Sequence, residues 1–308
     1  MKIIMYHYVR EYNSKYPFFR FLDIKNFRNQ LDFLENEYGF LKRDEWENYT
    51  LGVKSEESKD KVVLTFDDAM ICNYQYVIPE LKSRGIWALF YIPIKPYKDN
   101  EMLDVHKIHL LCGAFDGKLL LNYLRSIISP QMLIDKEIDY FRDSPYSKQN
   151  NYVGVSEFKR ILNYFVDYKY KKYLIDKVAL NFDYIFDPDS FYIKPKNIID
   201  MHNTGNIIGA HTVNHPVMSK LSYEEQLVEI DDSFSFLESI NCIAHKTYCH
   251  PYGGFKSFNK DTIKILNEKK VRYSFNVESR DASYNDILKN KHYLPRHNCN
   301  EFAYGKSS

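Results

Sequence analysis

The chain has 308 residues, of which 44% are hydrophobic, and its 42 basic and 41 acidic side chains leave a formal net charge of +1. A chain of this length and composition can bury a substantial core, as one large domain or two small ones. The basic residues are scattered along the chain, so the electrostatic footprint of a nucleic-acid-binding protein is missing. We therefore expect no nucleic-acid partner.

No stretch is typical of a targeting or membrane segment. Residues 1–19 lack the uninterrupted run of about 7–15 apolar residues that marks a signal peptide, and no stretch approaches the roughly 20 apolar residues of a membrane span. The five cysteines are odd in number and show no CxxC spacing, which favours neither a disulfide framework nor a thiolate zinc site. The sequence predicts a cytoplasmic protein with reduced cysteines.

Short apolar runs alternate with longer amphipathic stretches, the pattern of a parallel α/β architecture. The expected strands are residues 2–9, 61–67, 87–93, 207–212, 245–253, 271–277 and 292–298. Helices are expected at residues 24–39, 74–85, 222–240 and 258–270. Seven strand-containing units are enough for a closed or nearly closed barrel.

A long insertion separates the third expected strand from the fourth. It runs from about residue 94 to about residue 200, far longer than a usual βα connection. Helical patterns recur within it at residues 103–115, 128–141 and 158–182. We expect one catalytic domain, residues 1–308, with a helical insertion that covers one end of the barrel.

Two polar motifs follow expected strands. Asp67 and Asp68 end the apolar run VVLTF, and adjacent buried carboxylates are unfavourable unless a cation or a proton-transfer task compensates. His211 and His215 stand four residues apart after another strand, so that a helical turn would let both imidazoles reach one metal ion. Because active sites of parallel barrels assemble at the carboxyl ends of the strands, we expect the two motifs to meet in space.

Three motifs in order, TFDDA (65–69), HTVNH (211–215) and HPYGG (250–254), resemble those of the polysaccharide deacetylases, also called the NodB-homology or carbohydrate esterase family 4 group. The opening MYHYV (5–9) is similar to the circularly permuted, poly-N-acetylglucosamine deacetylase branch. The resemblance covers residues 1 to about 93 and about 200 to 300. It implies an α/β fold, the distorted (β/α)7 barrel of the NodB type.

The resemblance also implies roles for single residues. Asp67 would be the catalytic base, and the ligands of a divalent metal would be Asp68, His211 and His215. The metal is zinc in most such enzymes, with Co²⁺ or Ni²⁺ as alternatives. The backbone N–H of Tyr252 would hold the oxyanion.

The general acid has two candidates. His7 is the first, because imidazole titrates near neutrality and MYHYV matches the permuted branch. His297 is the second.

One position departs from the family pattern. The family often has Arg two residues before the Pro of HPYGG, where it pairs with the catalytic Asp, but this chain has Cys249 there. Arg296 ends the last expected strand, and we hypothesise that it supplies the missing cation.

The sequence thus predicts a metal-dependent hydrolase that removes N-acetyl groups from an N-acetylated amino sugar or polysaccharide. Water would attack directly, since no GxSxG-like nucleophile motif is present. Two alternatives stay open: hydrolysis of another amide or an ester, and a carbohydrate-binding barrel that has lost turnover.

Overall fold

The computed structural model describes residues 1–53, 60–134 and 152–307. It contains two compact units. The first unit comprises Met1–Glu11, Phe21–Glu101 and Asp189–Ser308, and the second comprises Tyr12–Arg20 and Met102–Pro188.

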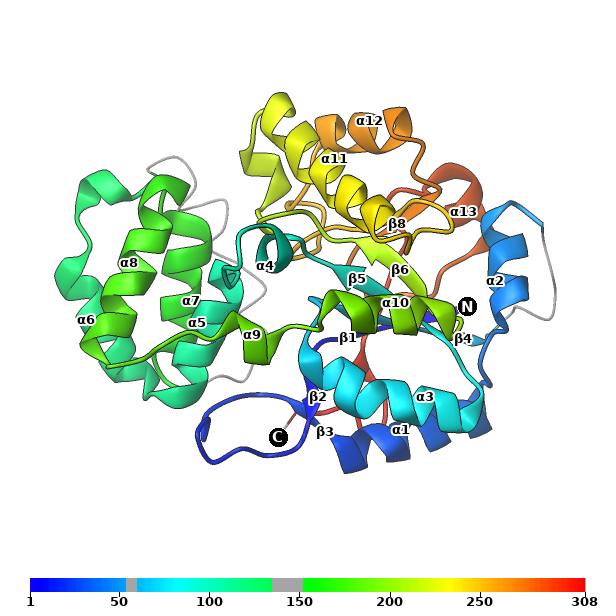
Figure 1. Ribbon diagram of the computed structural model, residues 1–308, viewed down its shortest axis with the longest axis horizontal. Coiled ribbons are helices and arrows are strands. Elements are labelled where there is room, and N and C mark those ends of the chain that lie inside the picture. Colours follow the sequence, from blue (N-terminus) through cyan, green and yellow to red (C-terminus); the bar gives the residue numbers. More distant parts are fainter. Residues whose placement is uncertain (54–59, 135–151, 308) are drawn as a thin grey trace. The chain divides into compact units, whose positions relative to one another are not determined.

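A curled parallel sheet forms the centre of the first unit (Figure 1). Within the described residues it has seven strands in the order β8-β7-β6-β5-β4-β1-β9. Their bounds are β1 Lys2–Tyr6, β4 Val62–Asp67, β5 Ala88–Ile92, β6 Ile207–Ala210, β7 Thr247–Cys249, β8 Tyr273–Phe275 and β9 His297–Asn298. Each lies within one of the seven expected strands, so the predicted parallel α/β architecture of seven strands is confirmed.

The two edges of the sheet approach each other through residues 294–298. β9 pairs with β1 in parallel, and Leu294, just before β9, forms a parallel bridge with Phe275 of β8. The backbone N–H of Leu294 donates to Ser274 O at 2.9 Å, and that of Asn276 donates to Leu294 O at 2.9 Å. This last segment therefore contacts both sides of the curled sheet.

β4 is buried along its whole length, which explains its uninterrupted apolar sequence. Its Phe66 stacks between Tyr6 of β1 and Phe90 of β5, with ring centroids 5.0 Å apart in both pairs. These three neighbouring strands thus share a layer of aromatic rings on one face of the sheet.

Helices surround the sheet of the first unit (Figure 1). They are α1 Ile24–Glu37, α2 Arg43–Thr50, α3 Ile78–Arg84, α4 Lys95–Lys98, α10 Pro195–Asn203, α11 Tyr223–Ser239, α12 Lys260–Glu268 and α13 Tyr284–Lys289. Helix α11 begins with a capping box formed by Ser222 and Glu225. Its buried positions recur every three or four residues, as expected of a helix with one face on the core.

The second unit is helical. Its helices are α5 Asp104–Ala114, α6 Gly117–Ile127, α7 Val155–Arg160 and α8 Tyr168–Asn181, and the short α9 Pro188–Phe191 follows at its boundary. Leu111, Leu120, Phe158 and Leu174 belong to its own apolar core. The helical pattern expected at residues 128–141 lies outside the described residues from 135 onward.

The helical unit differs in extent from the insertion expected at about 94–200. Ile94, Ile198 and Met201 are buried in the core of the first unit, so both ends of the expected insertion belong there. Residues 12–20, by contrast, join the helical unit: Phe18 N–H donates to Gly113 O at 2.9 Å. They leave the first unit between two short parallel strands, β2 Val9–Arg10 and β3 Leu22–Asp23. The sequence predicted Val9 as the end of one strand, 2–9, and did not indicate β3.

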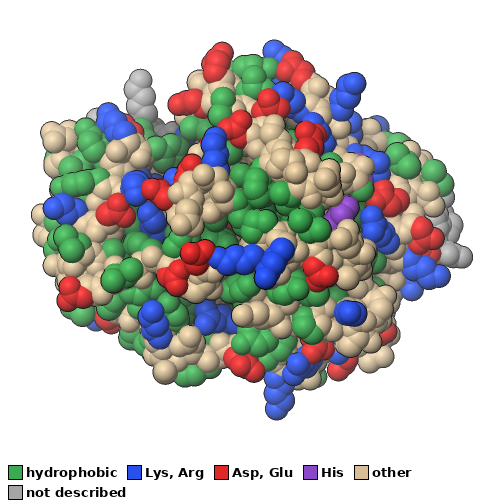
Figure 2. Space-filling view, in the orientation of Figure 1, with side chains coloured by type: hydrophobic (Ala, Val, Ile, Leu, Met, Phe, Trp, Pro, Cys, Tyr) green, Lys and Arg blue, Asp and Glu red, His purple; other side chains and the backbone are tan. Residues whose placement is uncertain are grey.

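Among the described residues, no helix has both the length and the apolar character that crossing a membrane requires. Basic and acidic side chains are interspersed over the face shown in Figure 2, in keeping with the small net charge of the chain.

We predict that Phe66→Ala lowers the free energy of unfolding by about 3–5 kcal/mol, because it removes the ring that packs between Tyr6 and Phe90. Leu288→Ala is the control, since Leu288 is 59% exposed on α13 and should change stability by no more than about 0.5 kcal/mol. Urea unfolding measures both. Equal losses in the two variants would contradict the packing argument.

Candidate metal centre and catalytic site

The two adjacent acids of TFDDA have different partners because the chain turns sharply between them. β4 ends at Asp67, and Asp68 and Ala69 both have left-handed backbone conformations, with φ of 77° and 54°. Such conformations are unfavourable for residues other than glycine and occur where the surrounding structure imposes them. The N–H of Asp68 donates to Tyr91 O of β5 at 3.0 Å, which fixes the start of the turn.

His211 and His215 lie on a tight turn after β6, rather than on the helical turn considered from the sequence. Thr212 and His215 have φ of 65° and 55°. The hydroxyl of Thr212 accepts the backbone N–H of His215 at 3.0 Å. This folding brings the two imidazole rings to a centroid distance of 4.8 Å.

Asp68, His211 and His215 form one buried cluster of potential metal ligands. Asp68 Oδ1 lies 3.4 Å from His211 Nε2 and 3.5 Å from His215 Nε2. One ligand atom from each residue lies within 4.8 Å of the others. The structure therefore brings together the three residues that the sequence indicated as ligands.

The hydrogen bonding of His211 supports a cation at this cluster. Its Nδ1 lies 2.8 Å from Cys249 O, which only accepts, so Nδ1 carries a hydrogen and Nε2 is the nitrogen that faces Asp68. Burial lowers the pKa of His211, yet the neighbouring Cys249, Asp68 and Asp67 raise it well above its usual value. The cluster thus favours a positive charge, and one carboxylate with two imidazoles is a donor set suited to zinc.

Asp67 forms a buried, bidentate ion pair with Arg296. Arg296 Nη1 donates to Asp67 Oδ1 and Nη2 donates to Oδ2, both at 2.9 Å. Burial raises the pKa of Asp67, but Arg296, His211 and His7 together lower it further, and the net shift is downward. Arg296 is held in turn by the Thr65 hydroxyl at 3.1 Å and by Asn276 O at 3.2 Å. The hypothesised cation partner of Asp67 is thus in contact with it.

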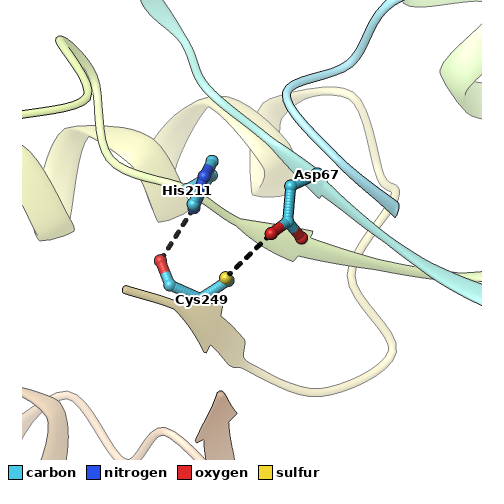
Figure 3. A group of neighbouring side chains, drawn as sticks. All are labelled: Asp67, His211 and Cys249. Carbon is cyan, nitrogen blue, oxygen red and sulfur yellow. Dashed lines mark hydrogen bonds between the residues drawn. The ribbon is translucent and has the colours of Figure 1, made fainter. Parts of the chain in front are cut away.

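Cys249 contacts both His211, through its backbone oxygen, and Asp67, through its thiol (Figure 3). Its Sγ lies 3.5 Å from Asp67 Oδ2, to which the thiol donates, and 3.0 Å from Arg296 Nη2. A second group of potential metal ligands consists of Asp67, His211 and Cys249. The guanidinium of Arg296 already supplies the positive charge there, and burial raises the pKa of the thiol, so a second metal ion is disfavoured.

His7 and Tyr252 lie beside the cluster. His7 Nε2 is 4.0 Å from Asp67 Oδ2 and 3.9 Å from Asp68 Oδ2, and its side chain is 39% exposed, whereas both acids are buried. The ring of Tyr252 packs against His215 at a centroid distance of 4.9 Å, and its φ is 64°. His7 therefore combines proximity to both acids with access to solvent.

His297 has other partners. Its Nε2 lies 2.8 Å from Asp281 and its Nδ1 lies 3.0 Å from Glu301. Neither acid belongs to the cluster described above, and both ring nitrogens are engaged. This arrangement favours His7 over His297 as a proton donor.

Sequence reasoning missed Glu229 of α11. Its carboxylate accepts the backbone N–H groups of Val213 and Asn214, both at 2.8 Å, inside the turn that carries the two histidines. The available signal was its place on the buried face of α11, where an acid is unusual.

Comparison with known proteins agrees with this architecture. The family model described as polysaccharide deacetylase matches residues 158–274, which include the HTVNH and HPYGG motifs. The peptidoglycan-N-acetylmuramic acid deacetylase PdaC of Bacillus subtilis is 31% identical over 71 residues. That match spans 23% of this chain and 15% of the relative.

Several solved structures share the fold. The deacetylase PplD of Streptococcus pyogenes, solved with acetate, has a TM-score of 0.59 at 16% identity, with 97% of this chain and 91% of that chain covered. A polysaccharide deacetylase of Bacillus cereus has a TM-score of 0.54 at 13% identity, covering 96% and 64%. IcaB of Ammonifex degensii has a TM-score of 0.51 at 16% identity, covering 89% and 82%.

The matched family model and the curated relative both carry the name of deacetylases, and the solved structures share the fold. The chain is thus similar to the polysaccharide deacetylases over residues 158–274 and has their barrel fold.

Proposed function

We propose that this chain is a metal-dependent hydrolase that removes N-acetyl groups from an N-acetylated amino sugar or polysaccharide. One observation carries the proposal: a buried carboxylate and two imidazoles converge beside a second carboxylate, Asp67, whose charge is maintained by Arg296. The names of the deacetylase relatives support the substrate class.

Asp68, His211 and His215 would hold the divalent metal, for which zinc is the first expectation and Co²⁺ or Ni²⁺ the alternatives. When bound, such a metal polarises the acetamide carbonyl and lowers the pKa of a water molecule. The Cys249 carbonyl orients His211 for this task by accepting its Nδ1 hydrogen.

Asp67 would act as the general base. It takes the proton of the attacking water, and Arg296 keeps the carboxylate ionised and fixes its orientation through both oxygens. The backbone N–H of Tyr252, beside His215, would donate to the oxyanion as the carbonyl carbon becomes tetrahedral.

His7 would protonate the departing amine as the C–N bond breaks, which yields acetate and the free amino sugar. Its exposure lets it exchange protons with solvent, and its distance to both acids places it at the same edge of the sheet.

The two alternatives predict different products. A metal-dependent hydrolase of other amides or esters would release acid from small non-sugar substrates. A carbohydrate-binding barrel would bind metal and glycan without releasing acetate, and Asp67→Asn would then change nothing measurable.

We predict acetate release from N-acetylglucosamine oligomers, lost on chelation and restored by Zn²⁺ or Co²⁺. Asp67→Asn should lower kcat by at least about 100-fold because it removes the general base. The control is Asp232→Asn, a partly exposed position on α11 paired with Lys98, which should retain full activity. Failure to release acetate from any N-acetylated glycan, with or without added metal, would refute the proposal.

A second prediction concerns pH. The pKa of Asp67 is depressed, so its carboxylate stays charged to a lower pH than an ordinary aspartate does, and the charge is lost as the pH falls through that depressed pKa. Arg296→Gln removes the largest of the charges that lower this pKa and should therefore raise it. We expect the acid limb of the kcat/KM profile to move up by at least about one pH unit.

Arg280→Gln is the matched control for this test. Arg280 also forms a bidentate pair, with Asp286 at 2.8 and 2.9 Å, but has no contact with the cluster. Arg280→Gln should leave the acid limb in place.

A rescue variant tests the same role. Cys249→Arg added to Arg296→Ala should recover part of the lost activity, since it restores a guanidinium at the position that the resemblance implies. An unchanged acid limb in Arg296→Gln would exclude this role for Arg296.

A third prediction separates the two candidate acids. His7→Ala should lower kcat on N-acetylated sugars by about 100-fold or more. The loss should shrink on acetate esters with acidic alcohols, because such leaving groups depart without a proton. His297→Ala should stay within about threefold of the unaltered protein on both. The reverse order of losses would assign the acid to His297.

A further inference from the structure

The turn between the two histidine ligands is strained. Thr212 and His215 are non-glycine residues with left-handed φ values of 65° and 55°, and they flank Val213 and Asn214. A turn of this kind relaxes unless neighbouring groups hold it. Relaxation would move the His211 and His215 rings apart, since one precedes the turn and the other ends it.

The carbonyl side of the turn is held by backbone. Ile94 N–H donates to Thr212 O at 3.1 Å, and Lys95 N–H donates to Val213 O at 3.0 Å. These two bonds fix one side of the turn to the segment after β5. They leave the N–H groups of Val213 and Asn214 on the other side to be satisfied elsewhere.

Glu229 satisfies those N–H groups. Its Oε2 accepts both backbone hydrogens at 2.8 Å, and its Oε1 accepts the side-chain amide of Asn214 at 2.6 Å. The residue is only 7% exposed, and burying a carboxylate is unfavourable unless hydrogen bonds compensate. Three donors compensate here, and all three belong to the turn.

The position of Glu229 is itself fixed. It lies on α11, where the next residue, Ile230, and the later Phe234 are fully or almost fully buried in the core of the first unit. The carboxylate is thus delivered by a helix whose orientation depends on core packing. Lys95 Nζ adds a contact to Asn214 Oδ1 at 3.3 Å on the outer side.

We propose that Glu229 is a positioning residue that holds the strained turn and thereby sets the separation of His211 and His215 for the metal. This inference rests on the proposed metal site. Glu229 acts through the turn, because its hydrogen bonds run to Val213 and Asn214, which lie between the two histidines.

The test measures metal affinity without substrate. Zn²⁺ binding is followed by competition with a chromophoric chelator, and the visible absorption of the Co²⁺-loaded protein reports the ligand geometry. Glu229→Ala should weaken Zn²⁺ binding by about 10- to 100-fold, the usual effect of losing a group that orients metal ligands. Its Co²⁺ spectrum should change in intensity and position.

Glu229→Gln tests whether the shape of the side chain or its charge is responsible. The amide oxygen can still accept both backbone hydrogens, while the amide nitrogen cannot accept from Asn214, so the loss should be about three- to tenfold. Asp232 lies about one turn later on α11 and is partly exposed. Asp232→Asn removes a charge outside the histidine turn and should bind Zn²⁺ normally. Thermal unfolding of each metal-free variant measures general damage separately.

The outcomes are distinct. If the unaltered protein binds no divalent metal, the proposed function fails. If it binds metal and Glu229→Ala binds within about threefold of it, the positioning role is overturned. Equal losses in Glu229→Ala and Glu229→Gln would also overturn it, in favour of a long-range charge effect. If Glu229→Ala does not fold, the Gln variant decides, and unchanged affinity there overturns the inference.

Discussion

The buried ion pair between Asp67 and Arg296 is the interaction on which the site depends. A buried pair of charges contributes little net stability, because desolvation offsets the attraction. Removal of one partner is far more damaging, since it leaves the other charge uncompensated. The pair joins the end of β4 to the segment that contacts both β8 and β1, so the geometry of the base and the approach of the sheet edges depend on the same contact.

Strain is concentrated at the carboxyl ends of the strands. Asp68, Thr212, His215 and Tyr252 all have left-handed backbone conformations without being glycine. Each such residue costs of order 1–3 kcal/mol, which the packed core must offset. Three of the four are proposed to serve the reaction through a side chain or a backbone N–H. The sharp turns are what let residues that are adjacent in sequence face different partners.

Much of this could be predicted from the sequence. The seven strands were visible because strands buried on both faces are apolar throughout, and β4 is the clearest example. The ligand cluster followed from motifs placed after strands. Three features were not predictable: the pairing of β2 with β3, the membership of residues 12–20 in the helical unit, and the hydrogen bonds from the histidine turn to Glu229. Each depends on contacts between segments that lie apart in the chain. Local pattern carries no information about such contacts.

Cys249 stands where the resemblance implies an arginine, and the arginine that contacts Asp67 is Arg296. Cys249 on β7 and Arg296 just before β9 both reach the carboxylate of Asp67, from opposite sides of the closing sheet. The positive charge beside Asp67 thus comes from Arg296, which lies outside the HPYGG motif. A search that scores each motif position separately would count this chain as incomplete, although its geometry lacks nothing at that point.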